Sequence, residues 1–314
     1  MAGFVAPARA ALQRSYAVPA RPVHAFGITF KNPLGLAAGY DKDGAAIAGL
    51  MALGFGHLEI GTVTPQPQAG NPRPRMFRLS REQAIINRLG FPSRGAACVA
   101  GQLKRARRRM GDVVIGVNLG KNRDTPLEDA SRDYLRLMDE FVGMASYLVI
   151  NVSSPNTEGL TRLQGRTLLG ALLGDISRGR ESLAAQRGRD MPILVKLSPD
   201  LTEQELQESV DVILEHGMDG IIATNTTVAR EGLPQRWQGE PGGLSGAPLR
   251  ERSEAALQNI VKRVRGRLPI ISVGGILTSE DARRRLDMGA KLIQIYTGMV
   301  FHGPGLVKRL LRNL

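Results

Sequence analysis

Eight short apolar segments recur along this chain, and each is followed by a polar turn and then by a stretch with helical periodicity. The segments are Leu34–Ala38, Leu58–Val63, Val113–Leu119, Tyr147–Val152, Ile193–Leu197, Gly220–Thr224, Ile270–Val273 and Leu292–Tyr296. They are almost unbroken runs of Val, Ile and Leu, which is typical of parallel strands that are buried on both faces. Eight strand–helix units in 314 residues predict a closed (β/α)8 TIM barrel rather than an open, doubly wound sheet.

Two of the helical stretches carry start and stop signals. The stretch Thr202–Glu215 opens with Thr202 and has Glu205 three residues later, which is the pattern of a capping box. The stretch Thr278–Met288 also opens with a threonine and is followed by Gly289, a residue type favoured just beyond helix ends. No linker rich in Pro or Ser interrupts the series, so one barrel domain is expected.

Two segments lie outside the repeat. Residues 64–95 hold five prolines and are too long for an ordinary connection, which predicts an insertion over the top of the barrel. Residues 1–25 form a short N-terminal extension that precedes the barrel at 26–314. Apolar residues recur at helical spacing in the extension, at Met1, Phe4, Val5, Ala8 and Leu12. It is either a loosely packed terminus or a surface that faces a membrane or a quinone, and the pattern leaves both open.

The composition narrows the class of protein. With 42 Lys and Arg against 29 Asp and Glu, the net charge of +13 permits nucleic acid, anionic lipid or an anionic small molecule as a partner. The densest basic runs lie in helical stretches and no aromatic residues interleave with them, so nucleic acid is not expected as a partner. One cysteine and four scattered histidines predict neither a disulfide nor a metal site. No stretch approaches the roughly 18 apolar residues of a membrane span, which predicts a soluble or peripheral protein.

Polar side chains gather where the predicted strands end, and barrel enzymes assemble their sites at these carboxyl ends. The set comprises Lys42, Thr62, Asn118, Asn151, Ser154, Lys196, Thr224, Asn225, Thr226, Tyr296 and Thr297. Because an unpaired buried charge is costly, Lys42 and Lys196 should each face an anion or an electron-rich ring. Glycine-rich turns at 242–246 and 273–276 lie near the last strands, where barrels commonly bind phosphate. The sequence therefore predicts a site for a phosphorylated ligand on the top face, and no GxGxxG motif supports a Rossmann nicotinamide site.

Seven motifs, in the same order, resemble those of the dihydroorotate dehydrogenases, the FMN enzymes of pyrimidine synthesis. They are Asn-Pro-Leu-Gly-Leu-Ala-Ala-Gly-x-Asp-Lys-Asp-Gly (32–44), Gly-Thr-Val-Thr-Pro (61–65), Asn-Arg-Leu-Gly-Phe (87–91), Gly-Val-Asn-x-Gly-Lys-Asn (116–122), Asn-x-Ser-Ser-Pro-Asn-Thr (151–157), Ala-Thr-Asn-Thr-Thr (223–227) and Gly-Gly-Leu-Ser-Gly (242–246). The resemblance extends from about Phe30 to the C-terminus. It implies a TIM barrel that binds FMN and oxidises (S)-dihydroorotate to orotate.

The resemblance also implies roles for individual residues. Contacts with FMN are expected from Ala38, Gly39, Tyr40, Asp41, Lys42, Thr62, Asn118, Asn151, Lys196, Thr224, Gly246, Gly275, Tyr296 and Thr297. Contacts with dihydroorotate are expected from Lys42, Asn87, Arg88, Leu89, Gly90, Phe91, Asn151, Asn156, Asn225 and Thr226. The catalytic base of this family is a serine in the quinone-dependent class and a cysteine in the soluble class, and here it is Ser154.

In the implied reaction, N5 of FMN takes a hydride from the substrate, Ser154 takes a proton, and a membrane quinone reoxidises the reduced flavin. A free serine is a poor base, so Ser154 must rely on desolvation, on Lys42 and on Thr157 as a relay partner. Lys196 is expected to stabilise negative charge on the reduced flavin. The implied location is the cytoplasmic side of the cell membrane, with peripheral attachment, and a monomer is the working expectation.

Two alternatives stay open at this point. One is a soluble-class enzyme that passes electrons to fumarate or NAD, and the other is a non-catalytic basic barrel that binds nucleic acid or another phosphorylated partner. The chain also departs from the family pattern in two places. It has Pro92-Ser93 where two asparagines are usual, and only about 25 residues precede its first barrel segments.

Overall fold

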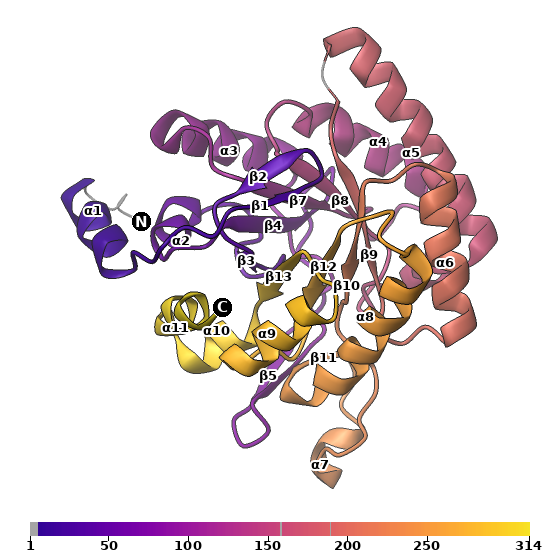
Figure 1. Ribbon diagram of the computed structural model, residues 1–314. Helices are drawn as coiled ribbons and strands as arrows, with labels where there is room; N and C mark the ends of the chain where they lie inside the picture. Colours follow the sequence, from indigo (N-terminus) through magenta and orange to yellow (C-terminus); the bar gives the residue numbers. More distant parts are fainter. Residues whose placement is uncertain (1–5, 158, 189) are drawn as a thin grey trace.

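The computed structural model describes residues 6–157, 159–188 and 190–314. Eight parallel strands close into a barrel in the order β10-β12-β13-β3-β4-β7-β8-β9, with helices around it (Figure 1). The barrel strands are β3 (Leu34–Leu36), β4 (His57–Val63), β7 (Ile115–Leu119), β8 (Tyr147–Asn151), β9 (Ile193–Leu197), β10 (Gly220–Ala223), β12 (Ile270–Val273) and β13 (Leu292–Ile295). Every predicted strand is present, and the TIM barrel is confirmed.

A helix follows most barrel strands and returns the chain to the next one. The helices are α1 (Ala6–Ser15), α2 (Ile47–Ala52), α3 (Ala96–Met110), α4 (Ala130–Phe141), α5 (Arg166–Arg187), α6 (Glu203–Glu215), α7 (Gln235–Gln238), α8 (Arg250–Val264), α9 (Ser279–Asp287), α10 (Thr297–His302) and α11 (Gly305–Asn313). The predicted capping box is present at α6, where the Glu205 carboxylate accepts from the Thr202 N–H at 2.8 Å. A second one opens α9, between Thr278 and Asp281. These caps fix where each helix begins and therefore where the preceding loop ends.

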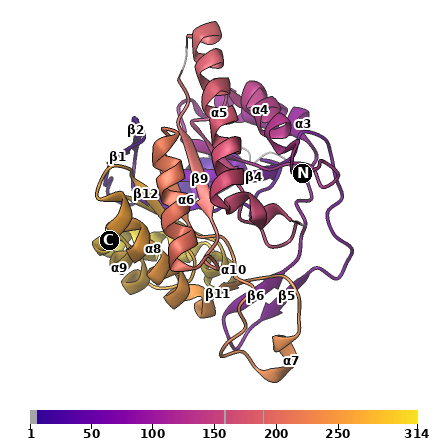
Figure 2. The ribbon, with the colours of Figure 1, turned by 90° about the vertical axis from the view of Figure 1, so that its right-hand side faces the viewer.

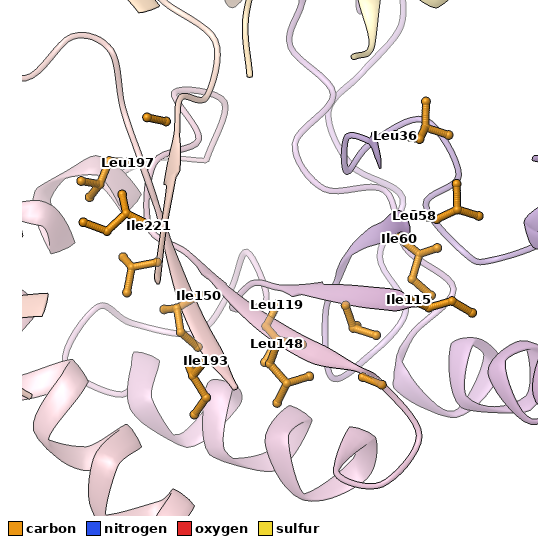
Figure 3. Packing of buried hydrophobic residues seen from close by; sticks show 14 of the residues in the cluster. Leu36, Leu58, Ile60, Ile115, Leu119, Leu148, Ile150, Ile193, Leu197 and Ile221 are labelled. Carbon is orange, nitrogen blue, oxygen red and sulfur yellow. The ribbon is translucent and has the colours of Figure 1, made fainter. Parts of the chain in front are cut away.

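Apolar side chains fill two layers of the barrel. Outward-facing residues such as Leu58, Leu148 and Ile193 are at most 1% exposed and pack against the surrounding helices (Figure 3). Burying each such side chain contributes about 1.5–3 kcal/mol to folding. A second cluster, which includes Tyr147 and Leu194, fills the barrel interior. The antiparallel hairpin of β1 (Val23–Ala25) and β2 (Ile28–Phe30) adds side chains to that inner cluster.

The insertion predicted at residues 64–95 contains the hairpin of β5 (Met76–Leu79) and β6 (Ala84–Asn87). The later strand β11 (Gly243–Gly246) pairs with β6 and completes a three-stranded antiparallel sheet. Figure 2 shows this sheet, together with α7, projecting from one end of the barrel. Because the chain that follows β6 lines the pocket at the strand ends, the insertion forms part of the site.

The N-terminal helix α1 lies at the edge of the barrel (Figure 1), where it packs against α2. Leu12 and Tyr16 are half-buried against the main core, and Lys308 on α11 donates to the Ser15 carbonyl at 2.5 Å. The helix begins at Ala6, which leaves Pro7 in the first turn, where proline is tolerated. The predicted apolar positions Met1, Phe4 and Val5 lie outside the described residues. Among the helices that the structure describes, none combines the length and the apolar character needed to cross a bilayer.

Candidate active site

A cavity of about 990 Å³, counting the space open to solvent, lies at the carboxyl ends of the barrel strands. Its walls come from the loops after the strands, from residues 87 and 89–92 of the insertion and from the glycine-rich turns at 245–246 and 274–275. They carry every site residue predicted from the sequence except Tyr40, Asp41, Arg88 and Asn118.

Three of these four exceptions lie at the edge of the pocket or behind its wall. The Asp41 carboxylate accepts from the backbone N–H groups of Ala45 and Ala46, each at 2.9 Å, and so fixes the turn that precedes α2. The Tyr40 ring is 37% exposed and meets the Tyr296 ring edge-on, with 5.5 Å between the centroids. Arg88 turns away to pair with Glu240, and its guanidinium lies 4.8 Å from the centre of the Phe77 ring.

Asn118 lies one layer below the pocket, in a ladder of polar side chains. Its amide nitrogen donates to the Glu59 carboxylate at 2.8 Å, so its amide oxygen is left to accept. That oxygen accepts from the Thr62 hydroxyl at 2.6 Å and from the Asn151 amide nitrogen at 2.9 Å. The Asn151 oxygen in turn accepts from the Asn225 amide nitrogen at 3.3 Å. Because an ionised carboxylate only accepts hydrogen bonds, Glu59 sets the orientation of each amide up to the pocket wall.

The same carboxylate has a charged partner. Lys196 Nζ lies 3.8 Å from Glu59 Oε1, and the two side chains are 7% and 0% exposed. Gln294 donates to the other oxygen of Glu59 at 2.8 Å. Burial lowers the pKa of the neighbouring His57 to about 3, so this ring is neutral and Lys196 supplies the positive charge. Sequence reasoning missed Glu59 and Gln294. The available signal was that each is a polar residue inside a mostly apolar strand, where a buried polar group needs a hydrogen-bond partner.

Ser154 follows β8 and is 4% exposed, with its side chain in the pocket wall. Its hydroxyl oxygen accepts from the Asn156 backbone N–H at 3.3 Å. Asn156 donates through its amide to Asn87 at 3.2 Å, while its buried amide oxygen has no partner within the described parts of the chain. The Thr157 hydroxyl is likewise without a partner there. The wall therefore holds a buried hydroxyl beside a free amide acceptor, and no histidine lines it in the described part of the chain.

Lys42 places a second amine in the wall. Its Nζ donates to the Gly39 carbonyl at 2.7 Å. Burial lowers the pKa of Lys42 to about 8, against an opposing effect of the Asp43 carboxylate. The amine is therefore mostly charged at neutral pH and loses its charge as the pH rises through about 8.

The pair Pro92-Ser93, which departs from the two asparagines usual at this place, anchors the loop that follows β6. Pro92 lines the pocket, and the buried Ser93 hydroxyl accepts from the N–H groups of Thr64 at 3.3 Å and Gly95 at 3.1 Å. The Ser93 backbone also exchanges two hydrogen bonds with Gln68. These contacts tie the loop to the end of β4.

At the opposite wall, the turn after β12 supplies bare backbone groups. Gly274, Gly275 and Ile276 line the pocket, with φ of +118° at Gly274 and +71° at Gly275. Within the parts of the chain that the structure describes, the N–H groups of Gly275 and Ile276 have no hydrogen-bond partner. Such groups, at the end of the seventh barrel strand, can bind a phosphate. Together with Lys196 and the amides, the donors in the pocket fit a phosphorylated, electron-accepting cofactor beside a small polar substrate.

The closed barrel and the polar pocket at its strand ends define the chain as a (β/α)8-barrel enzyme. The family model for dihydroorotate dehydrogenase matches residues 22–314. The chain belongs to the dihydroorotate dehydrogenase family.

Known proteins of that family are similar over almost the whole chain. A protein of Chromobacterium violaceum named dihydroorotate dehydrogenase (quinone) is 48% identical over 91% of this chain and 83% of its own length. One of Thiobacillus denitrificans with the same name is 48% identical over 94% of this chain and 87% of its own. The crystal structure of the Eimeria tenella enzyme in complex with ferulenol superposes with a TM-score of 0.88 at 39% identity, covering 97% of this chain and 88% of that one.

Proposed function

We propose that this chain oxidises (S)-dihydroorotate to orotate in pyrimidine biosynthesis, with FMN as its cofactor and a membrane quinone as electron acceptor. The observation that carries the proposal is one pocket that brings Ser154 and Lys42 together with Lys196 and an unpartnered glycine-rich turn. Family membership supports the reaction and disfavours a non-catalytic, phosphate-binding or nucleic-acid-binding barrel. Ser154 and the quinone-type relatives disfavour the fumarate- or NAD-linked class.

FMN is assigned to the wall that holds Lys196 and the glycine-rich turns. The assigned residues are Ala38, Gly39, Lys42, Thr62, Asn151, Lys196, Thr224, Gly246, Gly275, Tyr296 and Thr297. Tyr40, Asp41 and Asn118 act from the rim or from behind the wall, through the contacts described above. When bound, FMN supplies a hydride acceptor at its N5 atom. Lys196 offers a positive charge in a desolvated site, where it stabilises negative charge that develops on the ring.

Dihydroorotate is assigned to the part of the pocket between the insertion and the loop after β8. The assigned residues are Lys42, Asn87, Leu89, Gly90, Phe91, Asn151, Asn156, Asn225 and Thr226, with Arg88 holding the loop through Glu240. The substrate carries a carboxylate and ring amides, which need a cation together with both donors and acceptors. Lys42 supplies the cation, and the side-chain amides supply the donors and acceptors.

The residues around Ser154 explain how a serine can act as a base. The Ser154 oxygen takes the proton from C5 of the substrate and gives up its own hydroxyl proton in the same step, while the hydride leaves C6 for the flavin, which forms the C5–C6 double bond of orotate. The Asn156 N–H that points at this oxygen stabilises the negative charge that develops there as the hydroxyl proton departs. Burial keeps water away, and the free Thr157 hydroxyl is a candidate to pass the proton on. Lys42 adds a positive charge in the same wall.

Lys42 makes orotate binding depend on pH. We expect the affinity for orotate to be highest below about pH 8 and to fall as the pH rises through that value, because the neutral amine no longer attracts the carboxylate. Lys42→Met should weaken binding below pH 8 by about 1.5–3 kcal/mol and flatten the pH profile. Titration of the flavin spectrum with orotate at several pH values tests this. A variant that retains the wild-type profile would rule out Lys42 as the group that titrates.

We also propose that residues 1–25 form a membrane- and quinone-facing extension of the barrel at 26–314, with β1 at the end of the extension held to the barrel by its pairing with β2. Arg14 on α1 is exposed, and the residues that follow it, Ser15 and Tyr16, line a hollow together with Arg309 and Arg312. Each basic residue near an anionic surface contributes about 1 kcal/mol, screened by salt. The attachment is therefore peripheral and reversible, on the cytoplasmic side of the cell membrane, and the enzyme acts as a monomer.

Paired electron-acceptor assays test this part of the proposal. A long-chain quinone in liposomes should sustain dihydroorotate oxidation, whereas fumarate and NAD should not. Deletion of residues 1–16 should lower quinone turnover and salt-sensitive co-sedimentation with anionic liposomes, but spare turnover with a soluble dye, because the flavin half-reaction occurs in the barrel. If the deletion changes neither lipid binding nor quinone turnover, the extension is only a loosely packed terminus. Turnover with fumarate or NAD in place of quinone would overturn the assignment of the acceptor.

A further inference from the structure

Arg285 on α9 is a fully buried cation that the proposed reaction does not use. Its Nη2 donates to the Gly274 carbonyl and to the Ser253 hydroxyl, each at 2.7 Å, and to the Arg250 carbonyl at 3.2 Å. The carboxylate of Glu254 lies 3.4 Å from Nε. Burial lowers the pKa of Arg285 to about 10, so the group is charged at neutral pH. A buried cation is costly, and this one directs its shortest hydrogen bonds to a single junction, between the turn after β12 and the start of α8.

That junction forms the back of the glycine-rich turn after β12. The turn approaches the start of α8 so closely that a Cβ on Gly275 would lie 2.4 Å from the Arg250 Cα. The Ser253 hydroxyl oxygen lies 2.9 Å from both the Gly274 and the Arg250 carbonyl oxygens and shares its one hydrogen between them, so it bridges the same two segments. Arg285 and Ser253 therefore clamp the turn from the side that faces away from the pocket.

The clamp determines where the free Gly275 N–H points. The Gly274 carbonyl and the Gly275 N–H belong to one trans peptide unit, and in such a unit the two groups point in opposite directions. When Arg285 draws the carbonyl into the interior, the N–H is directed out, toward the pocket that Gly275 lines. Within the described chain this N–H has no partner, so it is available to a ligand.

We propose that Arg285 is a positioning residue for the phosphate of the flavin cofactor, through its hold on the Gly274 carbonyl and without contact with the phosphate itself. This inference rests on the proposed function, because it requires that the pocket bind FMN. It predicts a selective effect. Arg285 should matter for the affinity of a flavin that carries a phosphate and not for that of riboflavin, which has the same ring and no phosphate.

The test is to titrate the flavin-free, full-length protein with FMN and with riboflavin, following the fluorescence of each flavin. Arg285→Met should weaken FMN binding about tenfold and riboflavin binding less than about twofold. Arg285→Lys should restore part of the loss, because an ammonium supplies donors without the planar fork. Arg283→Met is the matched control, since Arg283 is an exposed arginine on the same helix and should leave both affinities unchanged.

A second variant covers the case in which Arg285→Met does not fold. Ser253→Ala removes a neutral bridge to the same carbonyls and should weaken FMN binding about threefold, with riboflavin binding unchanged. Equal losses for the two flavins in the Arg285 and Ser253 variants would overturn the inference and leave Arg285 a purely structural residue. A wild-type protein that binds FMN no more tightly than riboflavin would overturn the placement of the phosphate. If the wild type binds neither flavin, the proposed function itself fails and the inference with it.

Discussion

Ser154→Ala is expected to slow reduction of the bound flavin by dihydroorotate by a factor of about 10²–10⁴, the usual range for loss of a general base. The substitution removes the one atom assigned to take the proton from C5. Within the described chain the buried hydroxyl makes one long hydrogen bond, from the Asn156 N–H at 3.3 Å. Its removal should therefore disturb the pocket little, and both FMN and orotate should still bind. Anaerobic single-turnover stopped flow measures the reduction rate directly and separates it from the later transfer of electrons to quinone.

The neighbouring serine offers a matched control. Ser153 is also buried, but its hydroxyl bonds to Asn151 and Asn225 and does not line the pocket. Ser153→Ala should therefore slow reduction far less than Ser154→Ala. Ser154→Cys should keep part of the activity, because a thiolate is an adequate base at neutral to alkaline pH. Reduction of Ser154→Ala at the wild-type rate would remove Ser154 from the role of base.

Glu59→Ala is expected to lower the free energy of unfolding by about 3–5 kcal/mol, the magnitude measured when one partner of a buried ion pair is removed. The change would leave Lys196 buried at 7% exposure without its counter-ion. It would also deprive Asn118 and Gln294 of the acceptors that they reach at 2.8 Å. Urea denaturation monitored by circular dichroism gives the difference in unfolding free energy.

An exposed pair in the same barrel provides the control for Glu59. Glu215 pairs with Arg166 at 2.9 Å, but both side chains are about half exposed, at 52% and 50%. Surface pairs of this kind contribute about 0–1 kcal/mol, so Glu215→Ala should change stability by no more than that. Equal losses in the two variants would show that the Glu59 ladder does not contribute to stability as the contacts indicate.

The barrel could be predicted from the sequence because its determinants are local. Almost unbroken apolar runs such as Ile193–Leu197 become strands with the predicted bounds, and the Thr202 and Thr278 caps form as the spacing indicates. Most of the pocket wall could also be predicted, because the carboxyl ends of parallel strands meet at one end of a barrel. Residues that are far apart in sequence, such as Lys42 and Thr297, therefore line a single cavity.

The parts that escaped prediction depend on partners that are remote in sequence. Glu59 bonds to Asn118 and to Gln294, 59 and 235 positions away, and nothing near Glu59 reveals either partner. The orientation of Arg88 depends on Glu240, 152 positions further along. Arg285 lies in a basic run that reads as a solvated helix face, yet its neighbours Arg283 and Arg284 are exposed while Arg285 is buried. Only the packing of α9 against the turn after β12 distinguishes the three.

The central claim is that this pocket binds FMN and that dihydroorotate reduces it. The most direct measurement is the visible spectrum of the purified protein under anaerobic conditions, before and after addition of dihydroorotate. We predict a yellow protein with the absorbance of oxidised flavin, which bleaches on addition of dihydroorotate and yields one orotate for each flavin reduced. A colourless protein that takes up no FMN, or a flavin that dithionite bleaches and dihydroorotate does not, would contradict the claim.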